Sequence, residues 1–147
     1  MEKTYKKGDI LEIKIEDMSD EGLGIGKAEG YTLFVKDAVI GDTCLVKIMK
    51  AKKNYAFAHL EEVKEPSSFR LTPLCAKAKA CGGCQLQAMS YEAELKFKEN
   101  KVKNNLIRIG GFAEDFIELI KEPIVGMDTP CRYRNKAQYP VGYDKSR

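Results

Sequence analysis

Ile10-Leu11-Glu12-Ile13-Lys14-Ile15-Glu16 is the stretch that decides the fold of the first half of this chain. Apolar and charged residues alternate in it, so that Leu11, Ile13 and Ile15 share one face. Alternation with a period of two is typical of a strand that buries one face and exposes the other. The sequence therefore predicts a half-buried strand here.

More strands are expected after this one. Gly22, Gly24 and Gly26 alternate along the next segment, which indicates a strand that bends or that another backbone approaches closely. Three further strand-like runs follow, separated by turn residues, at 31–35, 43–49 and 55–63. Five short strands in so short a stretch predict a small closed barrel of the oligonucleotide-binding type, which the Pro-Ser break after Glu65 ends.

Beyond the barrel the pattern changes twice. Residues 65–89 hold clustered cysteines and are expected to form a loop without regular structure. From Ser90, a plausible N-cap, apolar residues recur at helical spacing, and Gly110-Gly111 ends the pattern, so a long helix is predicted over 90–111. Residues 116–125 and 132–143 look strand-like, so 112–147 should begin an α+β region. The expected fold class is mainly β with α.

Composition sets the limits of function. The chain has 147 residues, 44% of them hydrophobic and 32% charged, and a net charge of +3. No apolar run approaches the roughly 20 residues that span a bilayer, and the first residues lack a secretory signal. A cytoplasmic protein without a membrane partner is expected. The small net charge does not identify a partner, because nucleic-acid binding depends on local clustering.

The most specific motif is Cys75-x5-Cys81-Gly82-Gly83-Cys84-Gln85. Three thiols lie within ten residues, and the glycines allow the backbone to fold around an inorganic core, so the motif predicts a metal or cluster site. Zinc would require four ligands, usually as two pairs, whereas this chain has one Cys-x2-Cys pair and a single histidine, His59. Iron–sulfur is therefore favoured. Three ordinary thiols are the alternative.

A cubane cluster needs a fourth cysteine. Cys44 lies in an alternating strand with Val46 and Ile48, which indicates a small core residue. Cys131 is the remaining candidate within the chain.

Two basic stretches are candidates for RNA binding. The first is a basic hairpin with aromatic residues just beyond it, and phosphates attract its cations while unstacked bases attract its rings. The second alternates cationic residues with aromatic or polar ones along a probable strand, whose cations could follow a phosphate backbone. The candidates are Lys47, Lys50, Lys52, Lys53 and Tyr55, with Phe57 just beyond, and Arg132, Arg134 and Lys136. The alternatives are a solvated lysine-rich hairpin and a plain exposed strand face. The chain contains no motif of a hydrolase, a nucleotide-binding loop or a dinucleotide fold, so no catalytic residue is predicted.

Taken in order, these motifs resemble the RNA (uracil-5-)-methyltransferases of ribosomal or transfer RNA, in their iron–sulfur branch. The resemblance rests on Gly22 to Gly26, Leu33-Phe34-Val35, Gly41-Asp42, the cysteine motif, Ser90 to Lys96, Ile109-Gly110-Gly111 and Tyr133 to Gln138. It implies that residues 1–64 form a TRAM domain, an OB-like RNA-binding barrel. Residues 65–89 would be an iron–sulfur loop, with Cys75, Cys81 and Cys84 as three ligands of a 4Fe–4S cluster. Position 131 does not match the family's fourth ligand, which comes later than residue 147.

The resemblance also implies which parts of the whole protein bind RNA and which catalyse the reaction. The helix over 90–111 would pack on a catalytic domain that binds S-adenosylmethionine, and residues 112–147 would begin a central β-rich domain. The catalytic cysteine and the base would lie beyond Arg147, so the chain alone is expected to be inactive. A stand-alone RNA-binding protein with a structural metal site is the second hypothesis. A radical methylthiotransferase is disfavoured, because such enzymes use Cys-x3-Cys-x2-Cys.

Overall fold

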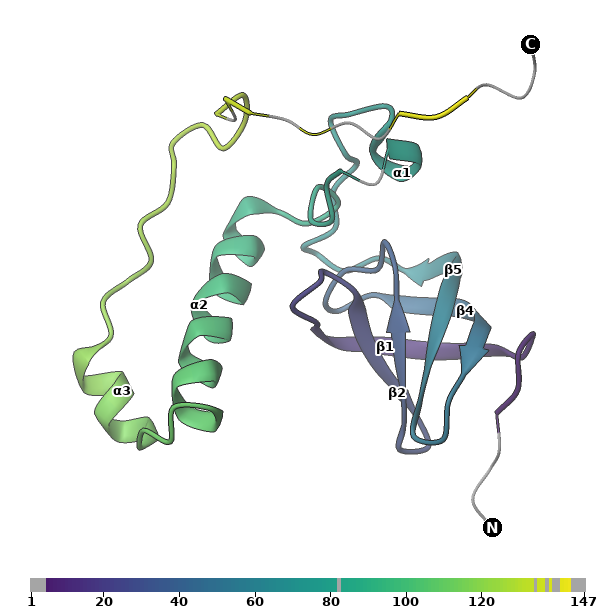
Figure 1. The fold of residues 1–147 in the computed structure, drawn as a ribbon, viewed down its shortest axis with the longest axis horizontal. Coiled ribbons are helices and arrows are strands. Elements are labelled where there is room, and N and C mark those ends of the chain that lie inside the picture. The colour runs from purple at the N-terminus through teal and green to yellow at the C-terminus, as the bar shows by residue number, and fades with distance from the viewer. Residues whose placement is uncertain (1–4, 82, 134, 137, 139–140, 144–147) are drawn as a thin grey trace.

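Five strands close into a small barrel in this computed structural model, which describes residues 5–81, 83–133, 135–136, 138 and 141–143 (Figure 1). The strand order around the barrel is β1-β2-β3-β5-β4, and only β3 and β5 are paired in parallel among these neighbours. The strands are β1 (Ile10–Met18), β2 (Gly24–Ala28), β3 (Tyr31–Val35), β4 (Thr43–Ala51) and β5 (Tyr55–Glu65). The predicted five-stranded barrel is confirmed.

The barrel core follows from the alternation in the sequence. Ile13 and Ile15 of β1 are buried, as are alternate residues of β3, β4 and β5. Cys44, Val46 and Ile48 are fully buried together in β4. The interpretation of Cys44 as a core residue is confirmed.

Gly26 shows why glycine alternates in β2. It pairs with Ile15 of β1, whose register with β2 shifts immediately afterwards, before Asp17. A Cβ atom at position 26 would lie 2.6 Å from the carbonyl oxygen of Lys14 and 2.9 Å from Cδ1 of Ile13. The predicted close approach of a second backbone is confirmed.

Replacing Gly26 with alanine is therefore expected to destabilise the barrel. The added methyl group can be accommodated only if the β1 backbone moves, and overpacking of this kind costs about 1–3 kcal/mol. Urea denaturation of the variant measures the change. Gly142→Ala is the matched control, since no atom of the described residues, apart from its chain neighbours, lies within 4 Å of a Cβ built there. Equal stability of the two variants would contradict the close approach.

The ends of the cysteine segment are tied together. Arg70 and Met89 form an isolated antiparallel bridge, and the Ser90 amide donates to the carbonyl oxygen of Phe69 at 2.7 Å. The segment between them includes one short helix, α1 (Ala78–Cys81), where the sequence predicted only loop. A single helical turn is too short to produce a periodic pattern in the sequence.

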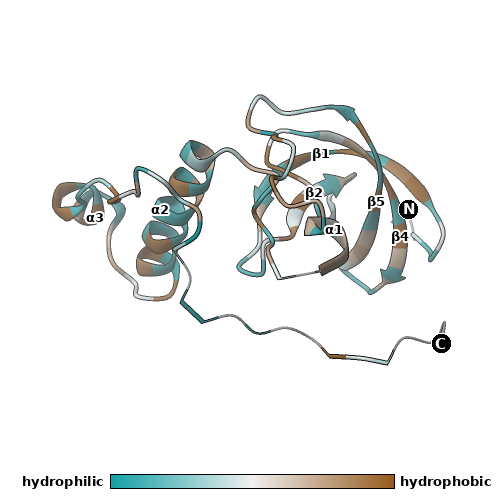
Figure 2. Ribbon diagram, turned by 90° about the horizontal axis from the view of Figure 1, so that it is seen from above, coloured by the Kyte–Doolittle hydropathy of each residue, from teal (hydrophilic) through white to brown (hydrophobic). Residues whose placement is uncertain are grey.

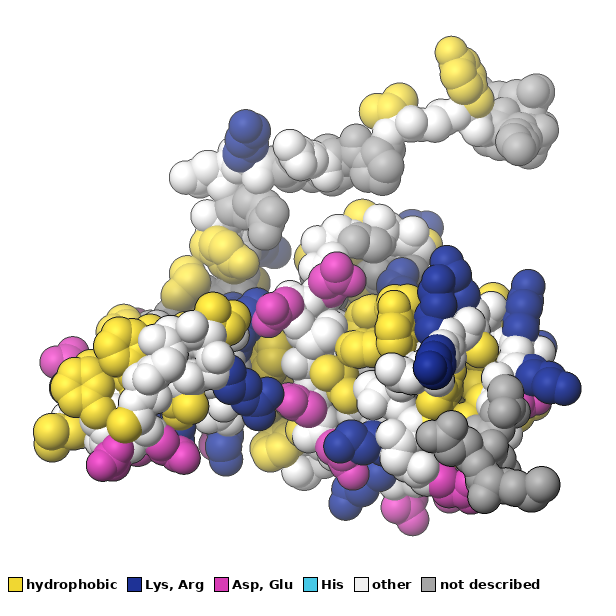
Figure 3. Space-filling view, turned by 60° about the horizontal axis from the view of Figure 1, so that its bottom comes forward, with side chains coloured by type: hydrophobic (Ala, Val, Ile, Leu, Met, Phe, Trp, Pro, Cys, Tyr) yellow, Lys and Arg dark blue, Asp and Glu magenta, His cyan; other side chains and the backbone are white. Residues whose placement is uncertain are grey.

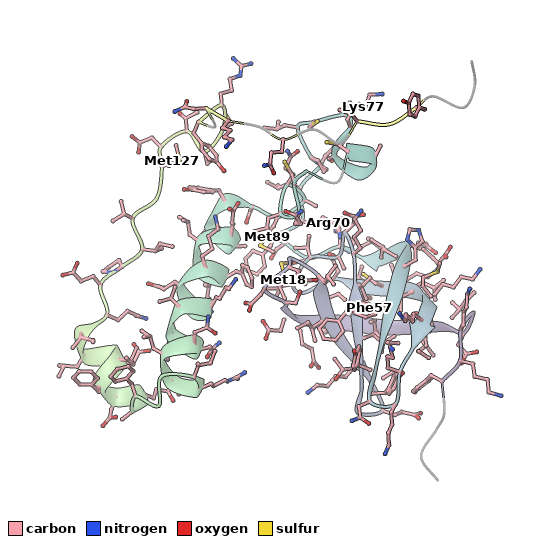
Figure 4. The ribbon with its side chains drawn as sticks, in the orientation of Figure 1. Met18, Phe57, Arg70, Lys77, Met89 and Met127 are labelled. Atoms are coloured by element: carbon pink, nitrogen blue, oxygen red, sulfur yellow. The ribbon has the colours of Figure 1, made fainter. Side chains whose placement is uncertain are left out.

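The predicted long helix is confirmed as α2 (Tyr91–Arg108), with Ser90 as its N-cap accepting from the Ala93 amide. Its ribbon carries both hydrophobic and hydrophilic residues (Figure 2). The first turns contact the barrel, where Met18, Val39, Met89 and Ala93 form a second buried cluster. Met18 and Met89 of this cluster lie between α2 and the barrel (Figure 4). Further along its apolar stripe, Val102 is 60% and Ile109 83% exposed.

The strand expected at 116–125 is wrong, because Glu114–Ile120 forms a helix, α3. Glu114 and Asp115 lie in its first turn, where acidic side chains favour a helix. Ile117 is buried, and Lys103 of α2 forms ion pairs with Glu114 at 2.8 Å and Glu118 at 2.5 Å. These tertiary contacts between α2 and α3 outweigh the strand-like composition.

The second expected strand, at 132–143, also fails where the structure describes the chain. Residues 132, 133, 135, 136, 138 and 141–143 are not in strands, and the remaining positions of this run lie outside the described residues. Among the described parts of the chain, no helix has the length and apolar character needed to cross a membrane.

Candidate nucleic-acid interface and cysteine loop

The β4–β5 hairpin brings together the first set of predicted RNA-binding residues. Lys47 and Lys50 are exposed on β4, Lys52 and Lys53 are exposed in the turn, and Tyr55 begins β5. These side chains therefore share one hairpin, as the sequence predicted.

The hairpin turn is held by a residue that the sequence did not single out. The hydroxyl of Tyr31, on β3, lies 2.7 Å from the carbonyl oxygens of both Lys52 and Tyr55. The Lys52 amide also donates to the Tyr55 carbonyl at 2.8 Å. These bonds fix the backbone that presents the turn lysines.

Three aromatic rings gather on the outside of the barrel beside these lysines. The ring centroids of Phe34, Tyr55 and Phe57 are 5.6 to 5.8 Å apart in all three pairs. Tyr55 is 37% exposed and Phe57 39% exposed. Phe34 belongs to the cluster because β3 and β5 run parallel with Phe34 opposite Phe57, a register that the sequence pattern does not reveal. We call these three rings the aromatic platform.

Cations flank the platform across the β4–β5 ladder. Lys50 pairs with Phe57, and Lys47 pairs with His59 two residues further along β5. On the barrel side of the molecule, hydrophobic side chains lie next to lysine or arginine side chains (Figure 3), and Phe57 lies on the barrel (Figure 4). The face thus combines groups for bases with groups for phosphates.

The second predicted set is not assembled in the same way. Arg132 and Lys136 are exposed, but neither is in a strand, and Arg132 has a left-handed backbone with φ of 58°. Arg134 lies outside the described residues. The described cations therefore do not share a strand face, contrary to the prediction.

Cys75, Cys81 and Cys84 are exposed free thiols on the tied loop. Backbone hydrogen bonds order part of it: the Cys75 carbonyl accepts from Ala78 at 3.0 Å, and the Cys81 amide donates to Lys77 at 2.8 Å. Within the described residues, no three cysteine, histidine or acidic side chains are close enough to hold a metal ion. The donor set fits a thiolate-bound cluster in its chemistry, although the three sulfur atoms are not gathered around a common point.

Comparison with known proteins identifies the barrel. Residues 5–60 match the TRAM domain family. The barrel is similar to TRAM domains, and we call it the TRAM barrel after this match. Relatives include uncharacterized RNA methyltransferases of Listeria monocytogenes serotype 4b, 42% identical over 94% of this chain and 29% of that protein, and of Clostridium tetani, 43% identical over 97% and 30%. The chain thus spans less than a third of the length of these relatives.

A solved structure that matches is the Pyrococcus abyssi tRNA (uracil-54, C5)-methyltransferase in complex with S-adenosyl-L-homocysteine. It is 26% identical, with a TM-score of 0.43, and the match covers 68% of this chain and 21% of that one.

A buried ion pair fastens the cysteine loop to the TRAM barrel. The Asp42 carboxylate is fully buried and accepts from the amides of Val39 at 2.7 Å and Ser67 at 2.9 Å. Arg70, at the start of the loop, donates to the same carboxylate through Nε at 3.0 Å and Nη2 at 2.6 Å, and to the Asp37 carbonyl at 2.9 Å. Figure 4 shows Arg70 where the loop meets the barrel. The local sequence around Asp42 does not indicate this role.

A second contact holds the other end of the loop. Gly22, in the turn before β2, has a φ of 78°, and a Cβ built there would lie 2.7 Å from Cβ of Gln85, the residue after Cys84. The loop therefore packs on the TRAM barrel at both of its ends.

Cys44 differs from the other cysteines, which predicts selective alkylation. Burial, and after it the nearby Asp42 carboxylate, raises the pKa of the Cys44 thiol to about 11. Thiolate is the reactive form, so at pH 8 only about one Cys44 in a thousand is reactive, and that sulfur is enclosed.

Iodoacetamide is expected to modify the four exposed cysteines of the metal-free native chain and to spare Cys44 until urea is added. Peptide mass spectrometry locates the labels. Labelling of Cys44 as fast as of Cys131 in the native chain would contradict its burial.

Proposed function

We propose that this chain is the RNA-binding and iron–sulfur portion of an S-adenosylmethionine-dependent RNA methyltransferase that forms 5-methyluridine in ribosomal or transfer RNA. The observation that carries the proposal is the similarity to proteins named RNA methyltransferases over 94% or more of the chain, at 42–43% identity. That similarity includes the barrel, the cysteine loop and α2. The proposed specificity for uracil rests on the sequence motifs. Catalysis is assigned to the whole protein, which we expect to act in the cytoplasm.

The TRAM barrel would hold the RNA in this proposal. An enzyme that modifies a base must extrude it from its stack, and contacts elsewhere on the RNA offset that cost. Lys47, Lys50, Lys52 and Lys53 supply such contacts from one hairpin. S-adenosylmethionine supplies the methyl group when bound, and no described residue of this chain is given a catalytic role.

Cys75, Cys81 and Cys84 would provide three ligands of a 4Fe–4S cluster. The fourth ligand is not assigned within this chain. We give the cluster a structural role, because methyl transfer to uridine requires no electron. The loop's two attachments to the barrel, at Asp42 and Gly22, support a scaffold that connects RNA recognition to the rest of the protein.

The exposed side of α2 and α3 would pack against the catalytic domain of the whole protein. A groove of about 370 Å³ lies between the two helices. Its apolar lining consists of Val102, Leu106, Ile117, Ile120 and Ile124. Apolar surface of this kind is typical of a contact with another part of a protein.

Methylation by the whole protein tests the proposed function. Purified under anaerobic conditions and supplied with S-adenosylmethionine, it should form 5-methyluridine in ribosomal or transfer RNA that lacks the modification. Digestion to nucleosides and mass spectrometry detect the product. A protein that binds RNA and metal but leaves every uridine unmethylated would overturn the proposal, and would favour a stand-alone RNA-binding protein with a structural metal site.

A further inference from the structure

Two side chains of the aromatic platform, Tyr55 and Phe57, are more than a third exposed to solvent although a buried position would stabilise them more. Exposing large aromatic side chains forfeits the hydrophobic free energy of burial. Phe34 and Phe57 lie side by side on neighbouring strands with 34° between their planes, so together they offer one broad surface. The Tyr55 ring is nearly perpendicular to both, at 89° and 87°.

The spacing of the rings selects the form of RNA that can lie on them. The rings of Phe34 and Phe57 lie side by side, with centroids 5.6 Å apart. A stack of bases exposes only its end face, so two consecutive bases can use one ring each only after they separate from each other. Paired bases in an A-form helix also keep their faces covered by their neighbours. Stacking of successive bases on these rings therefore favours an unpaired, unstacked segment.

The charges nearby suit the backbone of such a segment. Lys50 lies opposite Phe57 on β4, and Lys47 lies opposite His59 one step further along the same ladder. The two lysines therefore follow the edge of the platform, where the phosphates of nucleotides stacked on the rings would run. Lys52 and Lys53 continue the positive charge into the turn.

We propose that the outer face of β3, β5 and β4 is a stacking site for a short unpaired RNA segment, with bases on Phe34 and Phe57 and phosphates at Lys47 and Lys50. The proposal rests on the proposed RNA-binding function and adds the class of RNA that this face takes. It also adds Phe34, which sequence reasoning did not include in the site.

The full 147-residue chain tests this, with a fluorescein-labelled single-stranded oligouridine and a blunt RNA duplex of equal length as probes. The duplex should bind more weakly than the single strand in fluorescence anisotropy. Phe57→Leu and Phe34→Leu should each weaken single-strand binding by about 5- to 150-fold, the range for loss of one stacked base. Phe112→Leu is the matched control, because Phe112 is 47% exposed and stacks on Phe116, away from the barrel.

Salt dependence separates stacking from charge. Phe57→Leu removes no charge and should leave the slope of log K against log salt unchanged, whereas Lys50→Gln should reduce it by about 0.7, the value for one phosphate contact on a single strand. Circular dichroism confirms that each variant is folded. The inference is overturned if Phe57→Leu and Phe34→Leu bind single strands as well as Phe112→Leu does, if the duplex binds equally, or if neither RNA binds. Failure of the whole protein to methylate uridine, with this binding pattern intact, would instead overturn the proposed function.

Discussion

Asp42→Ala is expected to lower the free energy of unfolding by about 3–5 kcal/mol, the range for breaking a buried ion pair from one side. The substitution leaves the Arg70 guanidinium, whose side chain is 20% exposed, without its carboxylate. It also removes the acceptor of the Val39 and Ser67 amides. Urea denaturation measures the loss.

A double-mutant cycle with Arg70→Met tests whether the pair is the cause. Methionine keeps much of the aliphatic length of Arg70 and removes its charge, and the Asp42 carboxylate then stays buried without its cation. If the two side chains act on each other, the double variant should be more stable than the sum of the single losses predicts. Additive losses would show that Asp42 acts through its backbone contacts alone.

Glu62→Ala is the matched control for this cycle. Glu62 pairs with Lys64 at 2.7 Å, but both side chains are largely exposed, at 55% and 40%. Exposed pairs contribute about 0–1 kcal/mol. A loss in Glu62→Ala as large as that in Asp42→Ala would contradict the importance of burial.

Local sequence patterns predicted the barrel because each strand carries its own period-two alternation. The same holds for α2, whose N-cap, helical spacing and terminal glycines all lie within one short segment. The hairpin lysines could also be predicted, since strand, turn and strand are adjacent in the sequence. In each case the determining information is local.

Contacts between distant residues were not predicted. Asp42 and Arg70 are 28 positions apart, and nothing near either one indicates the other. Phe34 reaches Phe57 only through the parallel pairing of β3 with β5, which depends on how the barrel closes. The strand predicted at 116–125 failed for the same reason, because Lys103 and the burial of Ile117 favour a helix there.

The cysteine loop was predicted only in part from the sequence. Its residues were found from their spacing, and the structure shows how the loop is fastened but does not bring the three sulfur atoms together. Exposure does not separate the candidates, because Cys131 is exposed as well. Only the spacing of the motif separates Cys75, Cys81 and Cys84 from Cys131, and substitution can test it.

Replacing Cys75, Cys81 or Cys84 with alanine is expected to abolish most of the iron–sulfur absorbance of the anaerobically reconstituted whole protein. A 4Fe–4S cluster is held by four thiolates, so the loss of one ligand leaves an iron atom open. Iron and sulfide analysis, together with visible absorbance, measures the content. Cys131 is also exposed but lies outside the motif, so Cys131→Ala should retain the full cluster.

The pattern of losses distinguishes the remaining assignments. Loss of the cluster in Cys131→Ala would make Cys131 the fourth ligand, against its mismatch with the family. Zinc in place of iron would overturn the cluster and keep a metal site. Full iron content in all three motif variants would mean that these cysteines are ordinary thiols and do not bind the cluster. Because Arg70 fastens the loop to the barrel independently of the cysteines, the motif variants should still bind RNA, and a parallel loss of RNA binding would mean that the cluster, too, supports the recognition face.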